Sequence, residues 1–294
     1  MTLKAIFNTM KHDKNSIIAR LDKFLVSNKE ESDRAINVNS PSQVGRCKRA
    51  NYWMRTGEET ASTIDARTQR IFDNGTGMHE RIQAYLKAEG SLVFDEIPLI
   101  DEDLNIQGHT DGLLRMTPYD YSILELKSIN SNGFSKLKDA KEEHKLQAMV
   151  YLYCMEVRRQ ELREMSQEEF EASKPQREEF YASRYQHMKD GKKFTREEKI
   201  AFQVKINMDL DDLLYTIPKE IDSIVFLYEN KDTQELKEFV VKYDEDMMCS
   251  ILDYYEELND YIAKGELPPR EGTSKSCTTC RFCNYQISCW GGVI

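Results

Sequence analysis

The sequence lacks any long hydrophobic run. No segment of its 294 residues approaches the roughly 18–20 consecutive apolar residues that a membrane-spanning helix needs. The N-terminal segment carries scattered charges and has no apolar stretch followed by small residues, so it does not look like a secretory signal. We therefore expect a cytoplasmic protein, in the host cytoplasm if a phage encodes it, that has no membrane partner.

A surplus of basic residues is also lacking. The chain has 41 Lys and Arg against 51 Asp and Glu, a net charge of −10, which argues against a generally basic nucleic-acid-binding protein. Phosphate contacts depend on local charge, however, and the segment from Arg46 to Gly57 contains no acidic residue. Its cations would face phosphates and its aromatic residues would stack on bases, the alternative being a solvated basic loop beside core aromatics. The residues concerned are Arg46, Lys48, Arg49, Tyr52, Trp53 and Arg55.

Cysteine is scarce except at one end of the chain. Four of the seven cysteines lie in the last segment, at positions 277, 280, 283 and 289. Disulfides are rare inside cells, so clustered thiols there indicate a metal site. Cys154 and Cys249 lie in segments with helical apolar periodicity, and we expect them to fill the core.

The apolar pattern predicts a mixed α/β protein, because helical and strand-like segments alternate. Segments rich in apolar and β-branched residues, separated by turn residues, predict strands at 92–100, 104–116, 121–129 and around a turn at 230–232. Apolar residues at three- and four-residue steps predict helices at 1–35, 144–159 and 246–265, with a further helix that opens at the glycines of 74–90. Residues 156–220 are heavily charged and predict an exposed helical insertion.

Two carboxylates and a lysine stand out among the predicted strands. On a strand, Glu125 and Lys127 share one face, while the leucines beside them share the other. Hairpin pairing would bring Asp111 beside Glu125, and two converging carboxylates need a cation such as Mg²⁺ or Mn²⁺. The alternatives are an exposed ion pair for Glu125 and Lys127, and a simple turn at Asp111-Gly112.

Three more residues could complete such a site. His79 follows two glycines that permit close approach of another group, and its imidazole could be a third metal ligand; a structural helix histidine is the alternative. Gln147 and Tyr151 are four residues apart and share a helix face, although Tyr151 could instead belong to the apolar core.

These residues carry a family resemblance. Gly75-Thr76-x-x-His79, Gly108-x-x-Asp111, Glu125-Leu126-Lys127 and Gln147-x-x-x-Tyr151 resemble, in order and approximate spacing, the RecB-like branch of the PD-(D/E)XK nucleases. The resemblance implies a restriction-endonuclease-like mixed sheet flanked by helices, and a metal held by His79, Asp111, Glu125 and the Leu126 carbonyl. It further implies that Lys127 orients or activates water, while Gln147 and Tyr151 contact DNA or organise the site. The implied reaction is metal-assisted hydrolysis of phosphodiester bonds.

The cysteines resemble an iron–sulfur subset of the same branch, which includes CRISPR-associated adaptation nucleases, the AddB nuclease domain and the Okazaki-fragment helicase–nuclease. That resemblance implies a [4Fe-4S] cluster on Cys47, Cys280, Cys283 and Cys289, which would join the Cys47 region to the 277–294 tail. Cys277 departs from the pattern, so a local zinc site on Cys277, Cys280, Cys283 and Cys289 stays open.

The function expected from this resemblance is a Mg²⁺- or Mn²⁺-dependent exonuclease acting on single-stranded or frayed DNA, within one nuclease domain spanning 1–294. Its protein partners would come from recombination, replication or CRISPR adaptation. Two alternatives stay open: a DNA-binding or assembly factor with little turnover on the same scaffold, and the same nuclease stapled by zinc.

Overall fold

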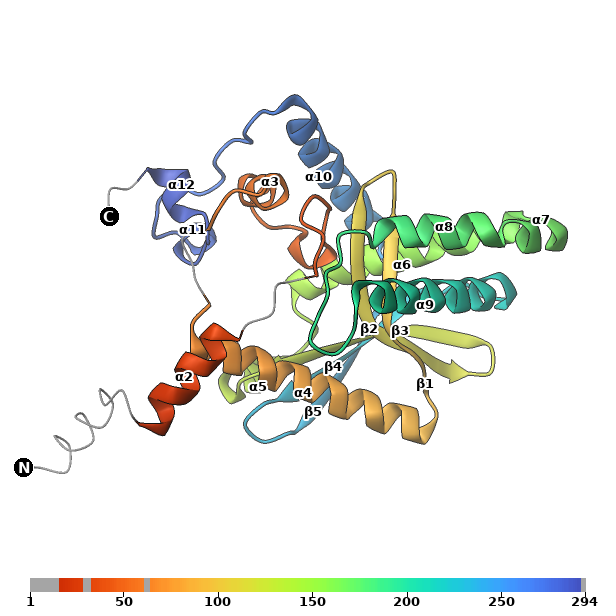
Figure 1. The fold of residues 1–294 in the computed structure, drawn as a ribbon, viewed down its shortest axis with the longest axis horizontal. Coiled ribbons are helices and arrows are strands. Elements are labelled where there is room, and N and C mark those ends of the chain that lie inside the picture. The colour runs from red at the N-terminus through yellow and green to blue at the C-terminus, as the bar shows by residue number, and fades with distance from the viewer. Residues whose placement is uncertain (1–15, 29–32, 61–63, 292–294) are drawn as a thin grey trace, which may run out of the picture.

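The computed structural model describes residues 16–28, 33–60 and 64–291, and its centre is a five-stranded mixed sheet (Figure 1). The strands lie in chain order: β1 (Leu92–Asp101), β2 (Ile106–Thr117), β3 (Asp120–Ile129), β4 (Ser223–Asn230) and β5 (Leu236–Lys242). Neighbouring strands are antiparallel except β3 and β4, which are parallel. The α/β class and the mixed sheet predicted from the sequence are confirmed.

Long helices cover one face of the sheet with the main hydrophobic core. They are α6 (Glu142–Glu164), α9 (Arg196–Thr216) and α10 (Glu245–Lys264). The centre of α6 packs fully buried Ala148, Met149 and Val150 against this face. Because α6 carries Gln147 and Tyr151 beside these apolar residues, packing of the core fixes their position relative to β3.

A single long helix, α4 (Ala66–Glu89), covers the other face. Its Met78 and Ile82 pack on Leu124 and Leu126 of β3 in a smaller apolar cluster. The leucines therefore face α4, and their neighbours Glu125 and Lys127 point the other way, as the alternation of a strand requires. The sheet is thus packed on both sides at the strand that carries both charged residues.

The shorter helices connect and extend this frame. They are α2 (Ile17–Ser27), the 3₁₀ turn η1 (Pro41–Gln43), α3 (Lys48–Thr56), α5 (Ser131–Lys136), α7 (Gln167–Ala172), α8 (Lys174–Arg184), α11 (Thr278–Arg281) and α12 (Gln286–Trp290). None of the helices in the described ranges is both long and apolar enough to cross a membrane.

Two helix predictions differ from the structure. The helix expected over 1–35 is observed at Ile17–Ser27, while residues 1–15 and 29–32 lie outside the described residues. The prediction that a helix opens at the glycines of 74–90 is wrong, because α4 already begins at Ala66. Asp65 caps its N-terminus by accepting a hydrogen bond from the Thr68 amide over 2.7 Å. Gly75 and Gly77 thus lie inside the helix, where each costs about 1 kcal/mol relative to alanine.

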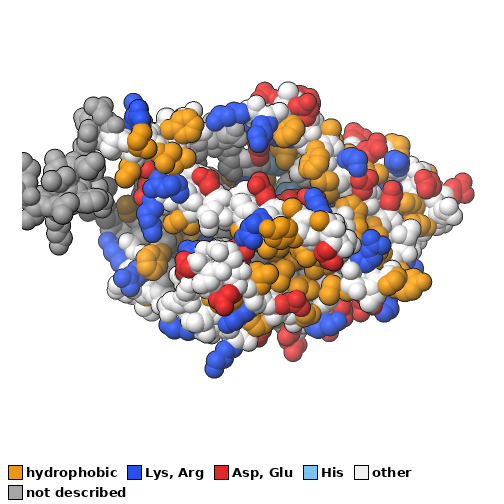
Figure 2. Space-filling model, turned by 90° about the horizontal axis from the view of Figure 1, so that it is seen from below, with side chains coloured by type: hydrophobic (Ala, Val, Ile, Leu, Met, Phe, Trp, Pro, Cys, Tyr) orange, Lys and Arg blue, Asp and Glu red, His pale blue; other side chains and the backbone are white. Residues whose placement is uncertain are grey.

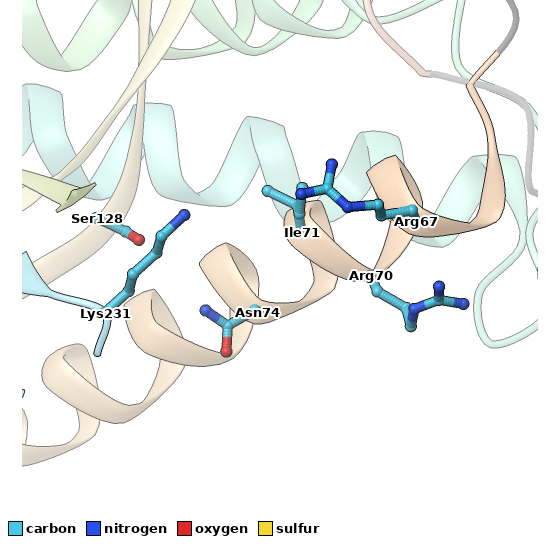
Figure 3. A pocket seen from close by; sticks show the side chains of 6 residues that line it. All are labelled: Arg67, Arg70, Ile71, Asn74, Ser128 and Lys231. Atoms are coloured by element: carbon cyan, nitrogen blue, oxygen red, sulfur yellow. The ribbon is translucent and has the colours of Figure 1, made fainter. Parts of the chain in front are cut away.

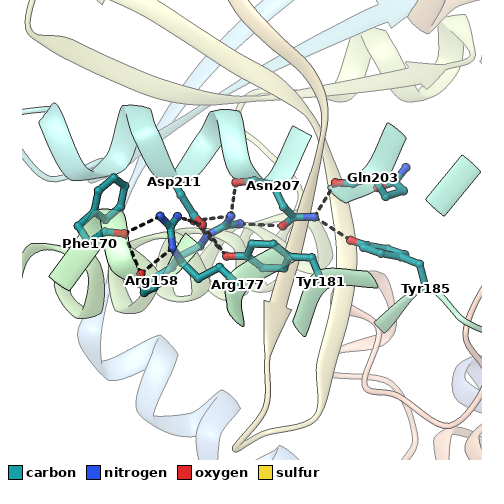
Figure 4. A network of polar contacts seen from close by, with 9 residues as sticks. Arg158, Phe170, Arg177, Tyr181, Tyr185, Gln203, Asn207 and Asp211 are labelled. Carbon is teal, nitrogen blue, oxygen red and sulfur yellow. Dashed lines mark hydrogen bonds and ion pairs between the residues drawn. The ribbon is translucent and has the colours of Figure 1, made fainter. Parts of the chain in front are cut away.

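The charged segment 156–220 is helical, but it also contains a buried ion network (Figure 4). Asp211 of α9 has a fully buried side chain and accepts hydrogen bonds from Arg158 of α6 over 2.7 Å and Arg177 of α8 over 2.6 Å. The Tyr181 hydroxyl donates to the same carboxylate. Some of the charged residues of this segment therefore join helices α6, α8 and α9 in the interior. The sequence pattern predicts only an exposed insertion.

Candidate active site

Three side chains from three elements converge beside the sheet. His79 of α4 has Nδ1 3.0 Å from a carboxylate oxygen of Asp111 on β2. One ligand atom each from His79, Asp111 and Glu96 of β1 lie within 4.8 Å of one another. Imidazole nitrogen and two carboxylates are ligands that Mg²⁺ or Mn²⁺ accepts. Burial lowers the pKa of His79, but the hydrogen bond and charge of Asp111 outweigh it and raise the pKa overall.

Glu96 was not singled out by the sequence patterns. It lies opposite Asp111, because Asp95 pairs with Gly112 and Ile97 with Thr110. Its backbone adopts φ +51°, a conformation that non-glycine residues rarely occupy and that often marks functional sites. Desolvation raises the pKa of its carboxyl, and a 3.0 Å hydrogen bond from Gln83 offsets this only in part.

Gln83 was also missed, although its position gave a signal. It follows His79 by four residues and therefore lies on the same face of α4. Its buried amide donates to Glu96 over 3.0 Å and to the Asp111 carbonyl over 2.9 Å. Gln83 thus joins the strand of Glu96 to the strand of Asp111.

Glu125 lies behind this group and is almost wholly buried. Its Oε1 accepts a hydrogen bond from Lys127 Nζ over 2.5 Å, while its Oε2 is buried without a hydrogen-bond partner among the described residues. Burial and the nearby Asp111 charge raise the pKa of Glu125 to about 7. A buried carboxylate oxygen without a partner is costly. A divalent cation would satisfy it, so the donor set fits such an ion.

A chain of hydrogen bonds continues from Glu125 to helix α6. Lys127 Nζ donates to Gln147 Oε1 over 3.2 Å, and the Gln147 amide bonds the Tyr151 hydroxyl. Burial raises the pKa of Tyr151 well above its ordinary value, so this phenol stays protonated. Hydrogen bonds thus link Glu125, Lys127, Gln147 and Tyr151 in one chain. The predicted ligand Glu125 is not part of the group of ligand atoms within 4.8 Å of one another, which consists of His79, Glu96 and Asp111.

The segments that carry the predicted thiols, the start of α3 and the C-terminal tail with α11 and α12, lie near each other (Figure 1). One cavity is lined by four of these thiols, Cys47, Cys280, Cys283 and Cys289. Lys48 donates its amide to Glu271 over 2.8 Å and Arg49 donates to the Pro268 carbonyl over 2.7 Å, which holds the two segments side by side. Cys277 does not line the cavity; the backbone amides around it lower the pKa of its thiol to about 7.

The basic segment 46–57 is partly used inside the protein. Arg55 is buried and donates to Asn39 and Asn259, while Trp53 is buried against Tyr285. Lys48 pairs with Glu257 over 2.5 Å, and Arg49 lies over the Trp53 ring. Arg46 is exposed and Tyr52 is half-buried. The six residues thus do not form one continuous exposed strip.

Comparisons with known proteins give one family. A model of the PD-(D/E)XK nuclease superfamily matches residues 16–290. Two solved structures are similar at low identity. The crystal structure of SSO0001 gives a TM-score of 0.45 at 13% identity, covering 99% of this chain and 98% of that chain. An alkaline exonuclease, LHK-Exo from Laribacter hongkongensis, gives 0.44 at 11% identity, covering 79% and 90%. No curated protein matches the sequence.

Proposed function

The chain belongs to the PD-(D/E)XK nuclease superfamily, and on that premise we propose that it is a Mg²⁺- or Mn²⁺-dependent deoxyribonuclease. The observation that carries the proposal is the buried Glu125 carboxylate, which has one oxygen without a partner and the other on Lys127. We propose His79, Asp111, Glu125 and the Leu126 carbonyl as the metal ligands, and we add Glu96.

Each residue has a separate task in this mechanism. A bound divalent cation would lower the pKa of a water and neutralise charge developing on the phosphate. Lys127, fixed between Glu125 and Gln147, orients the attacking water at its ammonium group. Gln147 and Tyr151 keep that ammonium in place, because the core around α6 fixes their own positions. Gln83 holds Glu96 against the strand of Asp111.

Digestion of labelled DNA tests the activity. End-labelled and end-blocked single and double strands are incubated with Mg²⁺, with Mn²⁺ and with EDTA. We expect metal-dependent products from DNA with free single-stranded or frayed ends and none from end-blocked strands, as for an exonuclease. Absence of any metal-dependent product would overturn the proposal and favour a DNA-binding or assembly factor on the same scaffold.

We further propose that the chain belongs to the RecB-like branch and carries a [4Fe-4S] cluster on Cys47, Cys280, Cys283 and Cys289. The shared cavity of these thiols supports it. The local zinc alternative would need Cys277, which does not line this cavity.

A side chain at Gly272 would approach the Cys280 sulfur to 2.2 Å and the Cys277 sulfur to 3.1 Å, so glycine leaves room beside both thiols. Cys280 belongs to both candidate ligand sets and Cys277 only to the zinc alternative, so Gly272 fits either site. We propose that residues 1–294 form one nuclease domain, with 156–220 as a helical insertion and the 277–294 tail joined to Cys47 through the cluster. Arg46, which is exposed, and Tyr52, which is half-buried, are the members of the 46–57 segment best placed for DNA.

Anaerobic purification tests the cluster. The protein should show a broad visible absorption that dithionite bleaches, with iron and acid-labile sulfide in equal amounts. Cys47→Ser and Cys283→Ser should lose both, whereas Cys277→Ser and Cys249→Ser should keep them. Colourless protein with stoichiometric zinc would contradict the cluster, and loss of iron in Cys277→Ser with retention in Cys47→Ser would contradict the ligand set.

A further inference from the structure

A cationic pocket lies at the N-terminal half of α4, apart from the residues of the candidate active site (Figure 3). It has a volume of about 310 Å³ and is lined by Arg67, Arg70, Ile71, Asn74, Ser128 and Lys231. None of these lining residues is acidic. Lys231 extends from the turn after β4 toward the helix, and Ser128 directly follows Lys127 on β3. The pocket therefore adjoins the strand end that carries the candidate catalytic lysine.

The cations of this pocket are largely without ion-pair partners. Arg70 pairs with Asp22 of α2 over 2.5 Å. Among the described residues, Arg67 and Lys231 have no carboxylate within the 4 Å of an ion pair, although Arg67 helps to lower the pKa of Asp65 and Lys231 that of Asp232 from a longer distance. In Figure 2, Lys and Arg side chains are spread over both halves of the visible face, and Asp and Glu are most frequent toward the right. Unpaired cations lining an acid-free pocket are suited to bind a phosphate group.

A path leads from this pocket to the active site along α4. Arg67, Ile71, Gly75 and His79 follow one another at four-residue steps, so they form one row that winds about 120° around the helix from the pocket to the active site. A side chain at Gly75 would meet nothing within 4 Å, so no packing in the described protein requires glycine there. Glycine in a helix interior is unfavourable, and this one leaves open space between the pocket and His79.

We propose that the pocket holds a phosphodiester group of the substrate strand, and that this strand passes over Gly75 to reach the active site. The inference rests on the proposed nuclease function and adds the position of the strand. Arg67 precedes His79 by twelve residues, which is about 18 Å along the helix. That length corresponds to about five nucleotides of B-form strand at 3.4 Å each, so a dinucleotide cut at the site cannot reach the pocket.

Equilibrium binding tests the pocket without depending on cleavage. Fluorescein-labelled single-stranded 20-mers, with and without a 5′-phosphate, are titrated in EDTA with wild type and with the double variant Arg67→Gln/Lys231→Gln. Arg115→Gln is the matched control. Arg115 is an exposed cation that pairs with Tyr121, seven residues before the pocket residue Ser128 on β3, and so lies at the far end of the β2–β3 hairpin. We expect at least a tenfold loss of affinity in the double variant and none in the control.

Salt dependence and substrate length make the same test sharper. Loss of two phosphate contacts should lower the slope of log affinity against log salt by about 1.4 for single strands. Cleavage of a labelled dinucleotide should be the same in the double variant as in wild type.

The 5′-phosphate shows which phosphate the pocket binds. If wild type binds the 20-mers with and without it equally, the pocket holds an internal phosphodiester; if the 5′-phosphate raises the affinity of wild type but not of the double variant, the pocket holds a terminal phosphate. The double variant binding 20-mers like Arg115→Gln would overturn the proposal. Failure of wild type to cleave any DNA would instead refute the nuclease function.

Alanine at Gly75 tests the path. Gly75→Ala should raise the melting temperature, because it removes a glycine from a helix interior. The same variant should bind the 20-mer several-fold more weakly, since its methyl group occupies the space given to the strand. Gly77→Ala is the matched control: its position is equally open and about 200° around the helix from Gly75. It should raise the melting temperature and leave binding unchanged. Equal binding by the two variants would contradict the path.

Discussion

The Asp111 carboxylate accepts a 2.6 Å hydrogen bond from the backbone amide of Leu126. This contact ties the acidic side chain of β2 to the strand that presents Glu125 and Lys127. One oxygen of Asp111 therefore bonds the backbone of β3, and the other lies 3.0 Å from Nδ1 of His79. The arrangement holds a candidate metal ligand in place before any ion binds, which is the rigidity that a catalytic site requires.

Removal of the lysine or the buried acid should abolish cleavage without unfolding the protein. Lys127→Ala and Glu125→Gln are expected to lose at least about 100-fold in DNA hydrolysis, because one loses the group that orients water and the other a metal ligand. Glu125→Gln should melt at or above the wild-type temperature in EDTA, since burial and Asp111 already disfavour its charge. Melting curves and initial rates measure both effects.

The matched control for these variants is Asp120→Asn, an exposed carboxylate at the turn between the same two strands. It should keep the wild-type rate. Mg²⁺ should raise the melting temperature of wild type and of Asp120→Asn, because an ion that binds the folded state stabilises that state. Glu125→Gln should show no such increase, because it lacks a proposed metal ligand. Cleavage at the wild-type rate by Lys127→Ala or Glu125→Gln would show that the site is assigned wrongly.

Glu96 should contribute to metal affinity although no sequence motif marks it. Glu96→Gln removes one of the two carboxylates in the group of three ligand atoms that lie within 4.8 Å of one another, so half-maximal activity should need at least about tenfold more Mg²⁺. Its neighbour Asp95 pairs with Lys87 over 2.5 Å, and Asp95→Asn is the control. Activity is titrated with Mg²⁺ for both. Superimposable titrations would exclude Glu96 as a ligand.

The buried ion network of the helical insertion should be essential for stability. Asp211→Asn leaves Arg158 and Arg177 without their anionic partner in the protein interior, so we expect a loss of about 3–5 kcal/mol in unfolding free energy. Asp209→Asn, on the same helix but more exposed, should change it by less than about 1 kcal/mol. Urea denaturation measures both. If the ion network did not contribute to stability, the urea denaturation curves of Asp211→Asn and Asp209→Asn would be similar.

His144 should make stability depend on pH. Burial lowers the pKa of His144 to about 3, and its Nδ1 lies 2.6 Å from the Tyr228 hydroxyl. The unfolded chain, with a histidine pKa of about 6.5, binds a proton between these values while the folded protein does not. Stability is therefore fully present above about pH 6.5 and is lost as the pH falls toward 3.

The variant His144→Gln isolates this effect, because all other titrating groups remain. Between pH 7 and pH 5 the wild type should lose about 2 kcal/mol more unfolding free energy than His144→Gln. Denaturation at the two pH values measures the difference. An equal loss in both proteins would show that His144 titrates normally in the folded state.

Much of the frame was predictable because it depends on local patterns. The alternation around Glu125 and Lys127 fixed their common face, and the turn residues between the strands of 104–129 placed Asp111 beside Glu125. The apolar periodicity of α6 likewise placed Gln147 and Tyr151 together. Four residues of the site are thus consequences of strand and helix periodicity.

Other features depend on tertiary contacts that no local pattern records. The start of α4 was misplaced because glycines usually mark helix ends, whereas here the Asp65 cap lies ten residues earlier. Glu96 gained its position from the pairing of β1 with β2, and its unusual φ has no sequence signature. Arg158, Arg177 and Asp211 come from three helices that pack only in the folded chain.

Anomalous scattering from crystals grown with Mn²⁺ tests the central claim most directly. Data collected on either side of the manganese absorption edge locate the ion without reference to activity. We predict one strong peak bounded by His79, Asp111 and Glu125, within ligand distance of their side chains and beside the Lys127 ammonium. A manganese peak elsewhere, with these side chains turned to solvent or bonded only to protein groups, would contradict it.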